Sequence, residues 1–146
     1  MTIQNLLARK DKKIYSIRKE ASLCDAIQSL AMHNTGALLV LDDRGELIGI
    51  ISERDIVRKA KQGCGSLDAL RVNDVMTKDL IIGFPEDDIS YVMAVMTKNH
   101  IRHLPVMSKK ELVGILSIGD VVEAQLSNAQ FENHLLNDYI TGKYPC

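Results

Sequence analysis

The sequence is poor in aromatic residues. Its 146 residues include no Trp, two Phe and four Tyr, although 46% of them are hydrophobic. A chain of this length suits one compact domain, which buries roughly two thirds of its unfolded surface. Without large rings, the core must be built from Leu, Ile, Val, Ala and Met.

Cysteine is scarce as well. The three cysteines, Cys24, Cys64 and Cys146, are odd in number and show no C-x-x-C spacing. This pattern argues against a disulfide framework and against a zinc site. We expect Cys24 to be a small core residue on a helix.

Neither sign of charge is in excess, and no hydrophobic run is long. Lys and Arg number 18 against 19 Asp and Glu, so the basic excess that drives binding to nucleic-acid phosphates is missing. Apolar runs such as residues 37–41 fall far short of the ~18 residues of a membrane span, and residues 1–13 contain no signal-peptide core. We therefore expect a soluble, cytoplasmic protein that binds neither nucleic acid nor membrane.

The sequence does contain an internal repeat. Residues 49–55 (GIISERD) recur 65 positions later as residues 114–120 (GILSIGD). The periodicity around each copy predicts the order β-α-β-β-α. Each copy alone is too small for a comfortable core, so we predict an α/β (α+β) fold in which two repeats pack with pseudo-twofold symmetry.

The predicted elements are similar in the two copies. Copy one has a helical lead, then strand, helix, two strands and helix, at residues 3–9, 14–17, 23–33, 37–41, 46–51 and 52–62. In copy two, the lead, the first strand and the second strand are expected at residues 72–76, 80–83 and 103–107, with Asp87 or Asp88 capping the helix between these two strands. We divide the chain into repeat one (1–62), a linker (63–71), repeat two (72–127) and a C-terminal helix and tail (128–146).

The C-terminal segment leaves the repeat. Its apolar residues have helical spacing, which predicts a helix that packs either on its own module or on a second copy. These residues are Phe131, Leu135, Leu136, Tyr139 and Ile140.

Each copy passes from a strand into a helix through Ser-x-x-Asp, as Ser52 with Asp55 and as Ser117 with Asp120. One interpretation is a capping box, in which Ser and Asp each accept a backbone N–H of the other residue. The other is a ligand site, because a carboxylate at a strand end can accept the hydroxyls of a ribose beside a helix start that favours anions. The motif alone leaves both interpretations open.

The copies differ before their apolar strand. Copy two has His100, Arg102 and His103 there, where copy one has Asn34, Gly36 and Ala37. Cationic donors beside a buried strand suit a phosphate, although a solvated turn is the alternative. The two histidines could also suggest a metal, but no neighbouring Cys or carboxylate completes a ligand set.

These motifs together resemble the tandem cystathionine-β-synthase (CBS) domain pair, also called a Bateman module. The matching stretches are residues 34–40 (NTGALLV), 49–58 (GIISERDIVR), 101–106 (IRHLPV) and 114–121 (GILSIGDV). The resemblance covers about residues 3 to 127, and residues 136–142 (LNDYITG) resemble the ending of a stand-alone CBS subfamily.

The resemblance implies adenine nucleotides as ligands, among them AMP, ADP, ATP, S-adenosylmethionine and NAD(H), bound in clefts between the repeats, with AMP favoured here. Each cleft would take its acid from one repeat and its other wall from the opposite repeat. Cleft A would use Ile50, Ser52, Asp55, Ile81, Ile101, Arg102, His103 and Pro105. Cleft B would use Ile115, Ser117, Asp120, Tyr15, Thr35, Gly36, Ala37 and Leu39.

The sequence shows no paired nucleophile and base and no Gly-rich phosphate loop, so we expect no enzymatic activity and no catalytic cofactor. The favoured function is a regulatory sensor that binds an adenosyl nucleotide and signals to a separate protein, whose identity the sequence does not give. The alternative is a structural dimerisation module whose Ser-x-x-Asp motifs are only caps. In both cases we expect a homodimer, because the helices after Ser52 and Ser117 carry apolar stripes.

Overall fold

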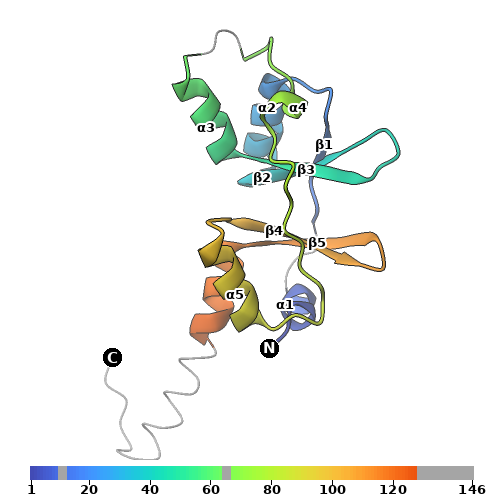
Figure 1. The fold of residues 1–146 in the computed structure, drawn as a ribbon, viewed down its shortest axis with the longest axis vertical. Coiled ribbons are helices and arrows are strands. Elements are labelled where there is room, and N and C mark those ends of the chain that lie inside the picture. Colours follow the sequence, from blue (N-terminus) through green and yellow to red (C-terminus); the bar gives the residue numbers. More distant parts are fainter. Residues whose placement is uncertain (10–12, 64–66, 128–146) are drawn as a thin grey trace, which may run out of the picture. The chain divides into compact units, whose positions relative to one another are not determined.

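The computed structural model describes residues 1–9, 13–63 and 67–127, which form two compact units (Figure 1). The central unit is Lys13–Ile81, and the terminal unit combines Met1–Lys12 with Ile82–Cys146. Both units mix helices with a small sheet, as predicted. No helix of the described residues is long and apolar enough to cross a membrane.

The central unit contains a three-stranded sheet in the order β1-β2-β3. Its strands β1, β2 and β3 span Ser16–Arg18, Ala37–Leu41 and Leu47–Ser52, and its helices α2, α3 and α4 span Leu23–His33, Glu53–Lys61 and Val72–Val75. Strand β1 runs parallel to β2, and β2 runs antiparallel to β3. The first strand therefore forms close to its predicted place, shifted toward residue 18.

The turn between β2 and β3 explains why the two strands can reverse direction within a few residues. Gly45 has φ +79°, a conformation that suits Gly. The Asp42 carboxylate accepts the backbone N–H groups of Glu46 and Arg44, each at 2.9 Å. These bonds, that of Glu46 first, hold the pKa of Asp42 below its ordinary value.

Helix α2 (Leu23–His33) covers the core of the central unit with a narrow apolar stripe. Leu23, Ala26 and Leu30 are buried, whereas Ile27 and Ala31 are exposed. The helix begins at a complete capping box of Ser22 and Asp25. The buried core of this unit comprises Leu23, Ala26, Leu30, Leu38, Val40, Ile51, Ile56, Val72 and Met76.

The terminal unit contains the antiparallel pair β4 (His103–Ser108) and β5 (Glu111–Ser117) with helices α1 (Ile3–Arg9) and α5 (Ile89–Lys98). Residues 118–127 are also helical. Asp88, one of the two predicted caps, is the N-cap of α5. The predicted helix with Phe131 and its apolar neighbours lies outside the described residues.

The strand predicted at residues 80–83 is wrong. Only Gly83 pairs with the sheet, through a single parallel bridge to Val106. Its N–H donates to Pro105 O at 2.9 Å, and its carbonyl accepts Met107 N–H at 3.0 Å. A Cβ at position 83 would lie 2.7 Å from Leu104 Cδ2 and 2.9 Å from Ile3 Cδ1, so a side chain there would displace those of Leu104 and Ile3.

The helical leads are exchanged between the sequence repeats. Helix α1 precedes repeat one but packs in the terminal unit, where Ile3 N–H donates to Asp87 O at 2.9 Å. Helix α4 precedes repeat two but packs in the central unit, where Val72 N–H donates to Ala21 O at 2.8 Å. Each unit is thus completed by a segment from the other repeat, a feature that the repeat boundaries do not indicate.

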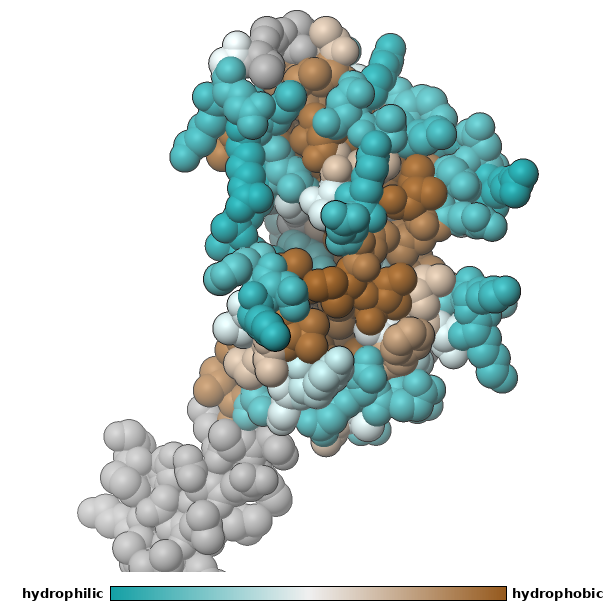
Figure 2. Space-filling model, in the orientation of Figure 1, coloured by the Kyte–Doolittle hydropathy of each residue, from teal (hydrophilic) through white to brown (hydrophobic). Residues whose placement is uncertain are grey.

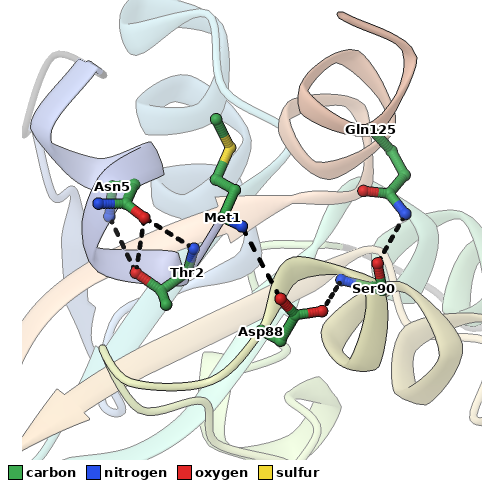
Figure 3. Close-up of polar contacts among 6 residues, drawn as sticks. All are labelled: Met1, Thr2, Asn5, Asp88, Ser90 and Gln125. Carbon is green, nitrogen blue, oxygen red and sulfur yellow. Dashed lines mark hydrogen bonds and ion pairs between the residues drawn. The ribbon is translucent and has the colours of Figure 1, made fainter. Parts of the chain in front are cut away.

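Polar contacts hold the start of α1 and of α5 (Figure 3). Asn5 Oδ1 accepts from Thr2 N and Thr2 Oγ1, at 2.9 and 3.0 Å. Asp88 accepts Ser90 N–H at 3.0 Å, and Gln125 Nε2 donates to Ser90 Oγ at 2.8 Å, which links helix 118–127 to α5. These exposed hydrogen bonds therefore supplement the apolar packing of the terminal unit.

A glycine in each sheet permits the lead to approach. A Cβ at Gly49 in β3 would lie 2.6 Å from Met76 Sδ and 3.0 Å from Thr77 O, and one at Gly114 in β5 would lie 2.9 Å from Leu7 Cδ2. Met76 and Leu7 occupy corresponding places at the ends of the two leads. At both glycines of the repeated motif, the lead therefore packs directly on the backbone of the strand.

We predict that Gly49→Ala destabilises the chain by about 1–3 kcal/mol, because the added carbon overpacks the contact with the Thr77 carbonyl. Gly119→Ala is the control. It lies in helix 118–127, where the new carbon meets only Ser117 Oγ at 3.6 Å, and should be neutral or stabilising by up to ~1 kcal/mol. Urea unfolding of the two variants measures both effects, and equal stability would contradict the packing role of Gly49.

Candidate functional site

The first Ser-x-x-Asp motif forms a capping box at the start of α3. Ser52 Oγ accepts Asp55 N–H at 3.2 Å, and Asp55 Oδ2 accepts Ser52 N–H at 3.0 Å. Ser52 Oγ also lies 3.1 Å from Asp55 Oδ2 as a donor. The capping interpretation is confirmed here, and it fixes the Asp55 carboxylate at the end of β3.

The second motif repeats this geometry at the end of β5. Asp120 N–H donates to Ser117 Oγ at 3.1 Å, and Ser117 N–H donates to Asp120 Oδ2 at 2.9 Å. In both motifs the capping bonds to the carboxylate use Oδ2, so Oδ1 lies outside the capping box. A cap and a ligand site are therefore compatible in the same carboxylate.

A further hydrogen bond joins the start of α3 to the residue before β2, and another joins the start of helix 118–127 to the residue before β4. Glu53 N–H donates to Gly36 O at 3.0 Å, and Ile118 N–H donates to Arg102 O at 2.7 Å. Together with the capping bonds, these contacts use several of the amide donors that a helix start otherwise offers to anions. In each motif, a ligand would therefore meet mainly the carboxylate and fewer of the backbone N–H groups at the helix start.

Thr77 joins the first motif, although the sequence reasoning did not include it. Its hydroxyl donates to Asp55 Oδ1 at 3.4 Å. Its backbone pairs with Ile50 in both directions, at 2.8 and 3.0 Å. No sequence pattern indicates this contact, because it depends on the exchanged lead, which brings residues after α4 beside β3.

Strand register brings predicted residues of both clefts together within each unit. In the central unit, Ala37 is paired with Ser52 and Leu39 with Ile50. In the terminal unit, His103 is paired with Ser117 and Pro105 with Ile115. Residues predicted for one cleft thus lie directly opposite residues predicted for the other cleft, on neighbouring strands of the same sheet.

Tyr15 and Thr35 lie at the ends of these strands. Tyr15 O accepts Leu39 N–H at 3.1 Å, and the Tyr15 ring stacks on His33 with centroids 3.9 Å apart and an angle of 14° between the rings. Thr35 Oγ1 donates to Ala37 O at 3.2 Å. His33 is a second residue that the sequence reasoning missed.

The cationic segment before β4 divides into residues with different roles. His100 has φ +55° after the end of α5, as Asn34 has φ +50° after α2, and the next N–H in each copy returns to the helix. His100 is therefore a helix-ending residue, whereas the exposed Arg102 is the stronger candidate for a phosphate. Within the described residues, no group of three or more His, Cys, Asp or Glu could hold a metal ion.

Cys24 lies on α2 as predicted but is half-buried, not a core residue. A hydrogen bond to Asp68, together with partial desolvation, raises the pKa of its thiol. A raised pKa disfavours the thiolate, so Cys24 has none of the activation expected of a nucleophile.

The predicted cleft residues divide between the units. For cleft A, Ile50, Ser52, Asp55 and Ile81 belong to the central unit, and Ile101, Arg102, His103 and Pro105 to the terminal unit. For cleft B, Ile115, Ser117 and Asp120 belong to the terminal unit, and Tyr15, Thr35, Gly36, Ala37 and Leu39 to the central unit. The pairing of these walls into clefts stays a prediction.

Comparison with known proteins gives the family. The family model for the CBS domain matches residues 9–61 and again residues 72–127. A mitochondrial CBS domain-containing protein of Arabidopsis thaliana is 42% identical over 124 residues, which are 82% of this chain. The chain spans 60% of the length of that relative.

Solved structures show the same architecture. A CBS-domain protein from Agrobacterium tumefaciens matches with a TM-score of 0.80 and 36% identity, over 85% of this chain and 92% of its own. A CBS domain pair solved in complex with 5′-methylthioadenosine and S-adenosyl-L-methionine matches with a TM-score of 0.76 and 22% identity, over 88% of this chain and 98% of its own. With two matched repeats and this architecture, the chain belongs to the CBS-domain family.

Proposed function

We propose that this chain is a regulatory module that binds adenosyl nucleotides at Asp55 and Asp120 and signals the bound state to a separate protein. One observation carries the proposal: in both units a capping box holds a carboxylate at the end of a sheet strand and leaves Oδ1 outside the box. A carboxylate oxygen held in this way is a suitable acceptor for ribose hydroxyls.

Arg102 supports AMP, ADP or ATP as the ligand over an uncharged adenosine. A guanidinium can form a charge-assisted, bidentate pair with a phosphate, and the side chain of Arg102 is exposed. The corresponding residue of the central unit is Gly36, which offers no charge. The site that includes Gly36 is therefore better suited to a less charged adenosyl ligand, such as S-adenosylmethionine, and NAD(H) remains a further candidate.

The two alternative functions have less support. An enzyme would need a reactive group, and the family matched over both repeats is a regulatory domain family with no catalytic domain among the matched residues. A structural dimerisation module would explain the capping boxes as caps alone. It would not explain why these two boxes, unlike the Ser22 and Asp25 box of α2, end strands of the sheets.

We predict that Asp55→Ala lowers the affinity for AMP by about ten- to hundredfold, or 1.5–3 kcal/mol, because a charged acceptor is lost. Folding should lose only about 1 kcal/mol, the usual value of a cap partner. Asp25→Ala is a matched control in the same unit. It removes the exposed carboxylate that completes the same kind of capping box at the start of α2.

Calorimetric titration with AMP and urea unfolding of both variants give the two readouts. The proposal expects similar losses of stability and a loss of affinity in Asp55→Ala alone. If Asp55→Ala binds AMP as the wild-type chain does, Asp55 is only a cap.

We further propose that the chain forms a homodimer through the helices that follow the two motifs. Part of the apolar stripe predicted on each of these helices packs into the core, because Ile56 and Val121 are buried. Val57 and Leu126 are nevertheless 56% and 55% exposed, and apolar side chains reach the surface in both units (Figure 2). If these side chains belong to one contiguous apolar patch, such a patch is typical of a protein contact.

Light scattering at tens of micromolar should return about twice the chain mass of 16.3 kDa. Val57→Lys or Leu126→Lys should shift the mass toward the monomer, because a charge would be buried in the contact. Thr97→Lys, at an exposed polar position of α5, should leave the mass unchanged. A wild-type mass of one chain would rule the dimer out.

A further inference from the structure

The Asp55 carboxylate is nearly saturated by the protein. A carboxylate offers about four lone-pair sites. Ser52 N–H and Ser52 Oγ both donate to Oδ2, and Thr77 Oγ1 donates to Oδ1. With these three bonds in place, one acceptor site remains, on Oδ1, so a second acceptor beside Asp55 favours the binding of both hydroxyls of a ribose.

Thr77 supplies the missing acceptor. A threonine hydroxyl that donates one hydrogen bond still has lone pairs for another, and this hydroxyl lies 3.4 Å from Asp55 Oδ1. Neighbouring ribose hydroxyls are spaced to meet two neighbouring acceptors of this kind. Thr77 is also exposed, so its hydroxyl is accessible to a ligand.

The backbone holds Thr77 in this place. Thr77 pairs with Ile50 in both directions, and Gly49 permits the close approach of the Thr77 carbonyl. The residue that corresponds to Thr77 after the other lead is Ala8, whose side chain carries no hydroxyl, and α1 continues as a helix to Arg9.

We propose that Thr77 is a specificity-determining residue of the Asp55 site: one ribose hydroxyl binds Asp55 Oδ1 and the other binds Thr77 Oγ1, so that the site selects an intact 2′,3′-diol. The inference rests on the proposed function, since it names how that same site recognises the sugar. It assigns the two hydroxyls to two residues, where the family resemblance assigns both to the acid.

The test compares AMP, 2′-deoxy-AMP and 3′-deoxy-AMP by calorimetric titration, in full chains that carry Asp120→Ala so that the Asp55 site reports alone. The parent chain should bind both deoxy analogues more weakly than AMP. Thr77→Val replaces the hydroxyl by a methyl group of similar size. It should weaken AMP about three- to tenfold, and one of the two deoxy analogues should then bind as tightly as AMP.

Thr77→Ser should restore the binding pattern of the parent chain, because it retains the hydroxyl. Thr97→Val, the same substitution at an exposed position of α5, should change nothing. If Thr77→Val does not fold, Thr77→Ala provides the same comparison with the backbone pairing to Ile50 retained.

The outcomes separate the inference from the proposed function. If Thr77→Val keeps both deoxy penalties unchanged, Thr77 has no part in sugar recognition, and nucleotide binding at Asp55 stands. If the Asp120→Ala chain fails to bind AMP although the wild-type chain binds it, the Asp55 site and the role of Thr77 are both overturned. If the wild-type chain binds none of the three ligands, the proposed function itself is wrong.

Discussion

The capping bond between a serine at a strand end and the aspartate three residues later is the interaction on which the site depends. It ends strands β3 and β5, begins the helices that follow them and orients a carboxylate at each junction. Because Oδ2 makes the capping bond in both motifs, the ligand chemistry that we propose for each site depends on what surrounds Oδ1. At Asp55 that surrounding includes a threonine hydroxyl. Under the proposed function, the stability of a helix start and the affinity for a ligand depend on the same side chain.

The exchanged leads explain why the two sites differ. Both leads pack against a sheet glycine, Gly49 with Met76 and Gly114 with Leu7, so the packing is nearly symmetric. Helix α4 ends at Val75, whereas α1 continues to Arg9. Only after α4 does an extended residue, Thr77, reach the edge of a sheet beside a capped aspartate within the described residues. The early end of α4 therefore allows the Thr77 hydroxyl to lie beside Asp55.

Most of the fold could be predicted from the sequence, because the repeat is regular in its local signals. The all-apolar β2, the Ser22 cap and the Ser-x-x-Asp helix starts each carry a strong pattern, and the structure confirms them. The strand at residues 80–83 could not be excluded, since its composition is strand-like, although in the structure only Gly83 pairs with the sheet. The contact of Thr77 with Asp55 could not be predicted either. It joins residues 22 positions apart through packing of a lead, which no local pattern describes.

The central claim is that the capped carboxylates bind adenosyl nucleotides, and titration of the unaltered chain tests it most directly. The panel is adenosine, AMP, ATP, NADH and S-adenosylmethionine, followed by calorimetry. We expect saturable binding of at least one phosphorylated ligand, with AMP about ten- to hundredfold tighter than adenosine if Arg102 pairs with the phosphate. No saturable binding of any ligand in the panel would contradict the account and leave the capping boxes as structural features alone.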